Sequence, residues 1–179
     1  MDKSKFFALA LYQLLFTALA ALFLLAQLLP LDTVPGGWPG PDLLLCLACA
    51  WVLRAPAHVP FALLAALFFA ADLLLQRPPG LWTALALIVT EILRVRQLQL
   101  RPLALPFELG LVAIFFTGMT FGQWAILGLT FADQPRLGMM LLQNFVTLLA
   151  YPLVVMVLHG IFGIRKRSQT NIIGNRARA

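Results

Sequence analysis

Residues 6–29 read FFALALYQLLFTALAALFLLAQLL, an apolar run with no charged residue and no proline. Such a run is long enough to cross the ~30 Å hydrocarbon core of a bilayer as a tilted helix. Lys3 and Lys5 precede the run, and Pro30 ends it. A cleaved signal peptide is the alternative, but its apolar core is usually ~7–15 residues long. The pattern therefore predicts an uncleaved membrane helix.

The composition of the whole chain agrees with a membrane protein. Hydrophobic residues make up 61% of the 179 residues, and charged residues only 11%, whereas about 25% is usual in soluble domains. The net charge is +6, but the basic residues lie between apolar runs and form no basic stripe of the kind that binds nucleic acid. We expect a lipid bilayer, and no nucleic acid, as the environment of this chain.

Five further apolar runs follow, separated by segments rich in proline, glycine and charged residues. The second run is too short to cross the bilayer alone, so either its neighbours shelter it or the preceding loop dips into the membrane. The sequence predicts an all-α, six-helix transmembrane bundle in a single domain, residues 1–164, followed by a basic cytoplasmic tail, residues 165–179. The six expected helices are 6–29, 42–53, 59–76, 81–93, 107–131 and 137–164.

The distribution of basic residues predicts the orientation of these helices. Six spans place both termini on one side of the membrane. If that side is cytoplasmic, all 13 lysines and arginines except Arg77 and Arg136 lie on it. Short cytoplasmic loops are enriched in lysine and arginine. We therefore expect a bacterial inner-membrane protein with both termini in the cytoplasm.

Signatures of catalysis are not found in the sequence. There is no His-Glu-x-x-His, no Gly-x-Ser-x-Gly and no phosphate-binding Gly-x-x-x-x-Gly-Lys. Cys46 and Cys49 have the spacing of a redox motif, but they lie inside an apolar run and are expected to be small buried side chains. The sequence predicts a non-enzyme with no catalytic residues, no bound metal and no cofactor.

Charged residues within apolar runs are costly in a membrane and often functional. Glu91 lies three residues before Arg94, a spacing that favours an ion pair on one helix face. Asp72 has two interpretations: a carboxylate paired near the outer surface, with Arg77 as a candidate partner, or an inward-facing residue that fixes the turn between the third and fourth helices. Glu108 is expected to be a favourable charge at a helix start.

Two small-scale patterns are candidates for helix association. Gly118 and Gly122 form a Gly-x-x-x-Gly motif, which lets two helix backbones approach closely, either within the bundle or against a partner helix. Gln143, Asn144 and Thr147 form a polar patch in the last helix. This patch predicts either hydrogen bonds between helices or the lining of a small-molecule cavity.

Several short motifs, in this order and spacing, resemble the rod shape-determining MreD family. They are Pro41-Asp42-Leu43-Leu44-Leu45, Trp51-Val52-Leu53-Arg54, Asp72-Leu73-Leu74, Gly80-Leu81 and Arg94-Val95-Arg96. The resemblance implies a fold similar to the substrate-binding subunits of vitamin transporters. It also implies a non-enzymatic scaffold of the cell-elongation machinery that binds MreC and couples to MreB and to the RodA–transpeptidase synthase, which makes sidewall peptidoglycan.

The candidate structural and partner-binding residues are then Asp42, Arg54, Asp72, Gly80, Gly118 and Gly122. The alternative function is a substrate-binding component of a vitamin-type transporter. Such components carry Ala-x-x-x-Ala in the first helix, and no pair of alanines four apart lies between Phe6 and Pro30. The sequence therefore favours the scaffold.

Overall fold

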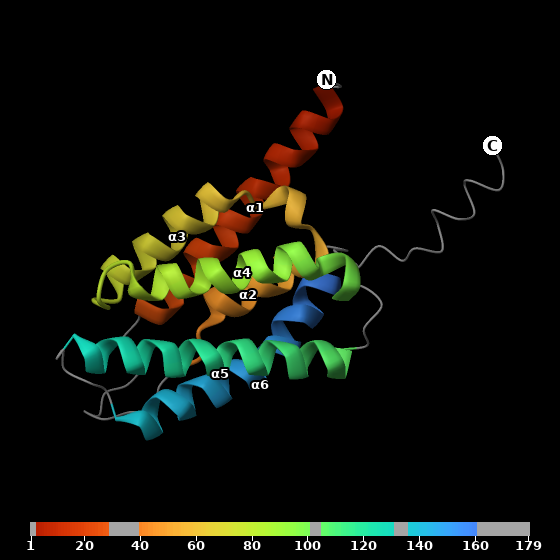
Figure 1. Cartoon of the computed structure of the whole chain (residues 1–179). Coiled ribbons are helices and arrows are strands. Elements are labelled where there is room, and N and C mark those ends of the chain that lie inside the picture. The colour runs from red at the N-terminus through yellow and green to blue at the C-terminus, as the bar shows by residue number, and fades with distance from the viewer. Residues whose placement is uncertain (1–2, 29–39, 101–104, 131–135, 161–179) are drawn as a thin grey trace.

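A computed structural model describes residues 3–28, 40–100, 105–130 and 136–160. Within these ranges the chain forms six α-helices and one short 3-10 helix, with no strand (Figure 1). The prediction of an all-α protein with six helices is confirmed for this part of the chain. The elements are α1 (Lys3–Leu28), α2 (Leu43–Arg54), η1 (Pro56–His58), α3 (Phe61–Leu74), α4 (Leu81–Leu100), α5 (Leu105–Leu129) and α6 (Leu137–Gly160).

The short helix α2 lies at the centre of the bundle. It packs against α1, α4 and α6, and all of its residues from Leu44 to Arg54 are buried. Trp51 is fully buried on α2 and contacts Phe16 of α1 edge to face, with ring centroids 5.2 Å apart. The structure supports the first of the two explanations for the shortness of this helix: neighbouring helices shelter it. The preceding loop, residues 29–39, lies outside the described residues.

Successive helices run in opposite directions, so that the bundle has two distinct ends (Figure 1). One end, which we call the Asp42 end, holds the start of α2. There the side chain of Gln27, near the end of α1, donates to the carbonyl of Pro41 (3.2 Å). The other end, the Arg54 end, holds the end of α2. There Arg94 of α4 donates to the carbonyls of Pro56 (2.9 Å) and Val59 (2.7 Å) before α3.

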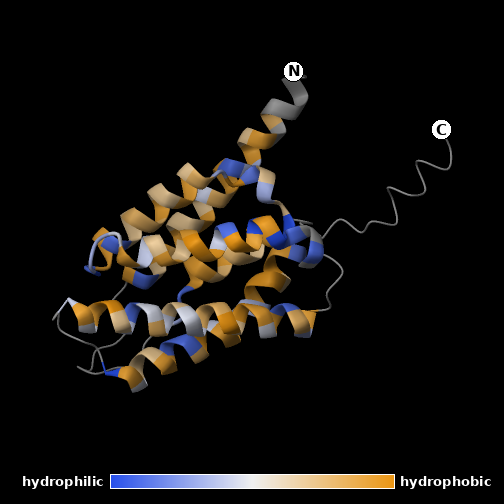
Figure 2. Ribbon diagram, viewed as in Figure 1, coloured by the Kyte–Doolittle hydropathy of each residue, from blue (hydrophilic) through white to orange (hydrophobic). Residues whose placement is uncertain are grey.

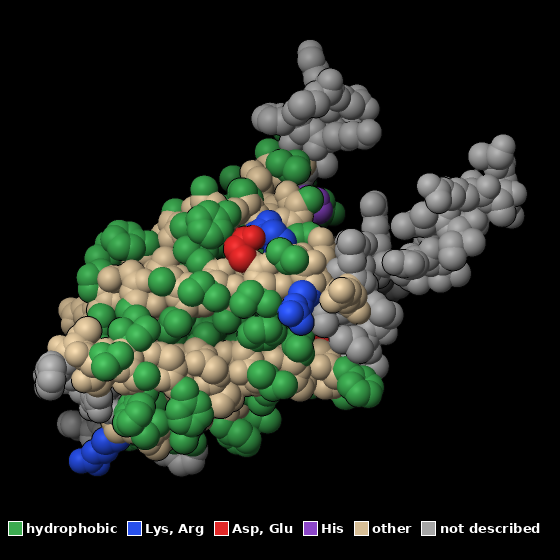
Figure 3. Space-filling view, viewed as in Figure 1, with side chains coloured by type: hydrophobic (Ala, Val, Ile, Leu, Met, Phe, Trp, Pro, Cys, Tyr) green, Lys and Arg blue, Asp and Glu red, His purple; other side chains and the backbone are tan. Residues whose placement is uncertain are grey.

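Three of the described helices are long and apolar enough to cross a membrane: Leu9–Leu28 within α1, and the whole of α5 and α6. Helices α2 and α3 are apolar but shorter. Hydrophobic residues predominate along the ribbons (Figure 2), and hydrophobic side chains cover much of the visible surface (Figure 3). Because water disfavours so much exposed apolar surface, this surface suits a lipid environment. Exposed examples are Phe7, Leu14, Val95, Phe107, Ile114, Leu129 and Leu153.

The largest departure from the predicted boundaries is in α4, which continues to Leu100 although the sequence analysis ended it at residue 93. Arg94 and Arg96 therefore lie inside the helix and do not close it. The reason is that residues 81–100 contain no proline or glycine, while arginine, glutamine and leucine are good helix formers. Arg94 is accommodated by an ion pair with Glu91 (2.9 Å), which confirms the predicted pairing.

The other helix ends differ by a few residues from the prediction, for local reasons. Helix α3 begins at Phe61, after Pro60, because proline cannot donate in a helix interior. It ends before Gln76, whose φ of 52° is left-handed. Helix α5 begins at Leu105, with Pro106 in its first turn, where a missing N–H has no consequence. The predicted ends at residues 29, 131 and 161–164 and the tail, 165–179, lie outside the described residues.

Candidate functional site

The buried polar residues of the bundle gather at the two ends of α2. We call the group at the Asp42 end the N-end cluster, and the group at the Arg54 end the C-end cluster. The N-end cluster comprises Asp42, Asp72, Arg77, Trp82, Thr83 and Thr147. The C-end cluster comprises Arg54, Glu108 and Tyr151.

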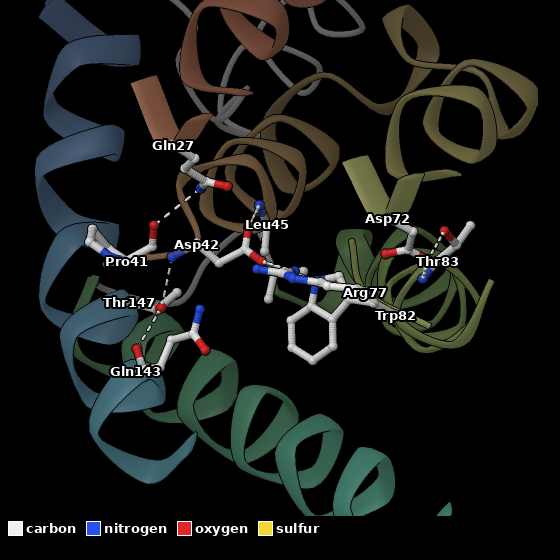
Figure 4. Close-up of polar contacts among 10 residues, drawn as sticks. All are labelled: Gln27, Pro41, Asp42, Leu45, Asp72, Arg77, Trp82, Thr83, Gln143 and Thr147. Carbon is white, nitrogen blue, oxygen red and sulfur yellow. Dashed lines mark hydrogen bonds and ion pairs between the residues drawn. The ribbon is translucent and has the colours of Figure 1, made fainter. Parts of the chain in front are cut away.

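Asp42 is the hub of the N-end cluster, although only 4% of its surface is exposed. Its Oδ1 accepts from the backbone N–H of Leu45 (3.0 Å), so that Asp42 is the N-cap of α2. Its Oδ2 accepts from Arg77 Nη1 and from Trp82 Nε1, both at 3.0 Å. One carboxylate thus joins the start of α2 to the α3–α4 turn and to α4 (Figure 4).

The backbone of Asp42 extends the same network to α6. Its N–H donates to Thr147 Oγ1 (3.0 Å), and that hydroxyl donates to the carbonyl of Gln143 (2.7 Å). The guanidinium of Arg77 also lies 5.3 Å from the ring centroid of Trp82, a cation–π arrangement. The charges of Asp42 and Arg77 are therefore compensated within the protein.

Asp72 is fully buried and fixes the turn between α3 and α4. Its Oδ2 accepts from the N–H of Gly80 (3.0 Å), the N–H of Thr83 (3.1 Å) and the hydroxyl of Thr83 (2.7 Å). Gly80 directly precedes α4 and Thr83 lies in its first turn, where backbone N–H groups lack helical partners. Of the two interpretations of Asp72, pairing with Arg77 is wrong, because the Arg77 guanidinium pairs with Asp42.

Gly80 is needed in this turn for its backbone conformation. Its φ is +86°, a region that residues with a Cβ rarely adopt. A Cβ built at Gly80 would meet no atom within 4 Å, so that substitution would strain the backbone without a steric clash. Gly80 and Asp72 therefore act together to direct the chain into α4.

The C-end cluster ties the end of α2 to α5 and α6. Arg54 Nη1 lies 3.0 Å from Glu108 Oε1 and also donates to the carbonyl of Ala50 (3.0 Å), while Nη2 lies 3.4 Å from Glu108 Oε2. The hydroxyl of Tyr151 donates to Glu108 Oε1 (2.5 Å). The exposed fractions of Arg54, Glu108 and Tyr151 are 9%, 3% and 0%. Glu108 is thus a buried partner of Arg54, a role beyond the favourable helix-start charge expected from the sequence.

The Gly-x-x-x-Gly motif of α5 makes only one of the two expected approaches within the chain. A Cβ at Gly122 would lie 3.5 Å from Cδ2 of Leu85 on α4, an ordinary van der Waals contact. A Cβ at Gly118 would meet nothing within 4 Å, and Gly118 is exposed. The prediction of a close helix approach at Gly118 is therefore wrong for the bundle itself. The side of α5 that carries Gly118 faces away from the described helices.

Gln143, Asn144 and Thr147 lie beside a small polar cavity between α2, α4, α5 and α6. The cavity has about 30 Å³ of space open to the centres of water molecules, which is enough for about two waters. Asn144 also donates to Thr117 of α5 (3.1 Å), a hydrogen bond between helices. Polar residues that line the cavity are Asp42, Trp82, Thr120, Gln123, Gln143, Asn144 and Thr147.

Other candidate chemistry is not assembled in the part of the chain that the structure describes. Cys46 and Cys49 are free and fully buried, and Cys46 Sγ donates to the carbonyl of Thr147 (3.2 Å). Within the described ranges, no group of three or more His, Cys, Asp or Glu side chains could hold a metal ion.

Sequence reasoning singled out Asp42, Arg54 and Asp72 but missed Trp82 and Tyr151, which complete the two clusters. The pairing of Glu108 with Arg54 could have been predicted from the sequence, because helices that alternate in direction place the end of α2 and the start of α5 at the same end of the bundle. Comparison of the chain with protein-family models, with curated proteins and with solved structures finds no match.

Proposed function

We propose that this protein is a non-enzymatic scaffold subunit of the cell-elongation machinery, similar in role to the MreD family. In this role it lies in the bacterial inner membrane with both termini in the cytoplasm. It binds MreC and couples, directly or through MreC, to MreB and to the RodA–transpeptidase synthase. It thereby supports rod shape and sidewall peptidoglycan synthesis.

One observation carries this proposal: apart from the exposed Arg96, the charged residues in the motifs that resemble MreD are ones that hold the helices together. Asp42 links α2 to α4, Arg54 links α2 to α5, and Asp72 caps α4 from α3. Gly80 makes the turn into α4, and Arg94 holds the carbonyls before α3. Motifs that act as fold-determining contacts support common ancestry better than motifs on an apolar surface would.

The same contacts suit a scaffold, because a docking surface works best when it is preorganised. The N-end cluster fixes the α3–α4 turn, in which Pro78 and Pro79 are exposed. This turn lies on the periplasmic side in the proposed orientation, where it is available to a partner. The cavity beside Gln143 is much smaller than the ~300–1,000 Å³ of typical ligand pockets, which favours the scaffold over a vitamin-type transporter component.

Depletion of the protein in its rod-shaped host tests this proposal. Cells should become round, and affinity capture of the full chain in mild detergent should recover MreC. An Asp72→Ala variant should lose both activities to a greater degree than Asp72→Asn, which keeps a hydrogen-bond acceptor for α4. Cells that stay rod-shaped and instead lose uptake of a vitamin would favour the transporter alternative.

A further inference from the structure

The side-chain amides of Gln123 and Gln143 point to a function for the cavity at the Asp42 end. Both residues line it, and among the described residues neither amide makes a hydrogen bond to another protein group. Figure 4 shows the amide of Gln143 directed from α6 toward the side of the cluster that holds Trp82. Two amides from two helices are therefore free to bind something within the cavity.

The depth of these amides makes their lack of protein partners significant. Gln123 lies six residues before the end of α5 at Leu129, and Gln143 lies six residues after the start of α6 at Leu137. At ~1.5 Å per residue, each amide is about 9 Å from its helix end. Both helices are long and apolar enough to cross a membrane. Both side chains are half-buried, and an amide removed from water is disfavoured unless a hydrogen-bonding group meets it.

The charge of the cavity wall restricts what can bind there. Asp42 is the only acidic residue among the lining side chains, and its Oδ2 already accepts from Arg77 and Trp82. A cation would be repelled by the neighbouring guanidinium of Arg77, and an anion would be repelled by the carboxylate of Asp42. By contrast, amide and hydroxyl groups in the wall both donate and accept hydrogen bonds, so that the cavity suits an uncharged group with both capacities.

We propose that this cavity is a binding site for an uncharged donor–acceptor group the size of a primary carboxamide. Its oxygen and NH₂ replace about two water molecules, for which the ~30 Å³ of the cavity has room. This inference goes beyond the scaffold role and does not depend on it. The carboxamide comes either from a small free molecule or from an asparagine or glutamine side chain of a neighbouring membrane helix, since both present the same chemistry.

The first experiment uses acetamide as the probe and the purified full chain in mild detergent. Saturation-transfer NMR should detect bound acetamide, but not acetate, which is charged, or N,N-dimethylacetamide, which lacks donors. Gln143→Leu and Gln123→Leu should each weaken acetamide binding about fivefold, the effect of losing one hydrogen bond. Gln99→Leu, an exposed position on α4 far from the cavity, is the matched control and should bind as the parent does.

A second experiment distinguishes the two sources of the group. We compare the association of two transmembrane peptides with the protein in vesicles. One peptide is made of leucine and alanine with a single asparagine about 9 Å from its end, and the other is its all-apolar counterpart. Association that needs both the asparagine and Gln143 assigns the carboxamide to a partner helix. Equal association of the two peptides, with acetamide binding intact, assigns it to a free ligand.

Two results would overturn the proposal. One is acetamide binding no better than N,N-dimethylacetamide in the first experiment. The other is acetamide binding that is unchanged in a Gln143→Leu, Gln123→Leu double variant whose circular dichroism matches that of the parent, since such a protein is folded but lacks both amides.

Discussion

Replacing Arg54 with methionine should destabilise the bundle strongly, because it breaks a buried ion pair. Methionine keeps the length of the side chain but removes the charge. Glu108, only 3% exposed, then keeps its hydrogen bond from Tyr151 but loses the guanidinium that lies 3.0 Å from Oε1. Breaking a buried ion pair from one side costs about 3–5 kcal/mol, because an uncompensated charge remains.

The size of this effect makes it measurable in detergent. At about 1.4 kcal/mol per factor of ten, the folding equilibrium should fall by roughly two to three and a half orders of magnitude. Unfolding by added dodecyl sulfate, followed by tryptophan fluorescence and circular dichroism, measures the free energy of unfolding. Tyr151→Phe removes one hydrogen bond to a charged group and should cost less, about 1.5–3 kcal/mol.

Two further variants separate the ion pair from general effects of substitution. Arg96→Met changes an exposed arginine on α4 and should alter stability by no more than about 0.5 kcal/mol. The double variant Arg54→Met, Glu108→Leu removes both charges and should recover most of the lost stability, because the uncompensated carboxylate is gone. If Arg54→Met is as stable as Arg96→Met, or if the double variant is no more stable than Arg54→Met alone, the ion pair does not have the proposed role.

Three other predictions concern the turn into α4, the packing of α5 and the membrane topology. Asp72→Ala should lower the free energy of unfolding by about 2 kcal/mol. Asp72→Asn should lower it by roughly half as much or less, because the amide oxygen still accepts hydrogen bonds from the start of α4. Equal losses for the two variants in the same detergent titration would contradict the capping role. Gly122→Ile should reduce the free energy of unfolding, because even a Cβ at this position would contact Leu85. Gly118→Ile should leave the stability of the isolated protein unchanged. A larger loss for Gly118→Ile than for Gly122→Ile would contradict the packing of α5. Alkaline phosphatase fused after Ala179 should be inactive and phosphatase inserted within residues 31–40 active; an active C-terminal fusion would refute the six-span topology.

Most of the fold could be predicted from the sequence because apolar runs and helix-breaking residues are local signals. Pro78 and Pro79 lie in the turn between α3 and α4, as expected for residues that disfavour a helix interior, although Pro152 is accommodated inside α6. The end of α4 could not be predicted in this way. Arg94 and Arg96 were interpreted as the end of an apolar run, yet a charged side chain does not stop a helix when its head finds partners elsewhere. For Arg94 those partners are carbonyls before α3, more than 30 residues away.

The members of the site could be predicted better than its pairings. Asp42, Arg54 and Asp72 attract attention because a charge beside or inside an apolar run is costly. Their partners depend on tertiary structure. Arg77 lies five residues from Asp72, but its guanidinium passes over Trp82 to reach Asp42, 35 positions earlier in the chain. Sequence separation is a poor guide here because Asp72 is already used by the first turn of α4.

The length of α2 explains why polar clusters stand at both of its ends. Twelve residues span only ~18 Å at ~1.5 Å per residue, whereas the hydrocarbon core of a bilayer is about 30 Å thick. If the longer α1, α5 and α6 cross the membrane, a helix this short packed among them has at least one polar end within the hydrocarbon level. Bulk water and lipid headgroups do not reach an end at that level, so the protein must supply most of the partners. Asp42 and Arg54 meet this need with the N–H and C=O groups of their own helix and with side chains from the surrounding ones. Both clusters therefore follow from a single constraint: the two ends of α2 must find their polar partners within the protein.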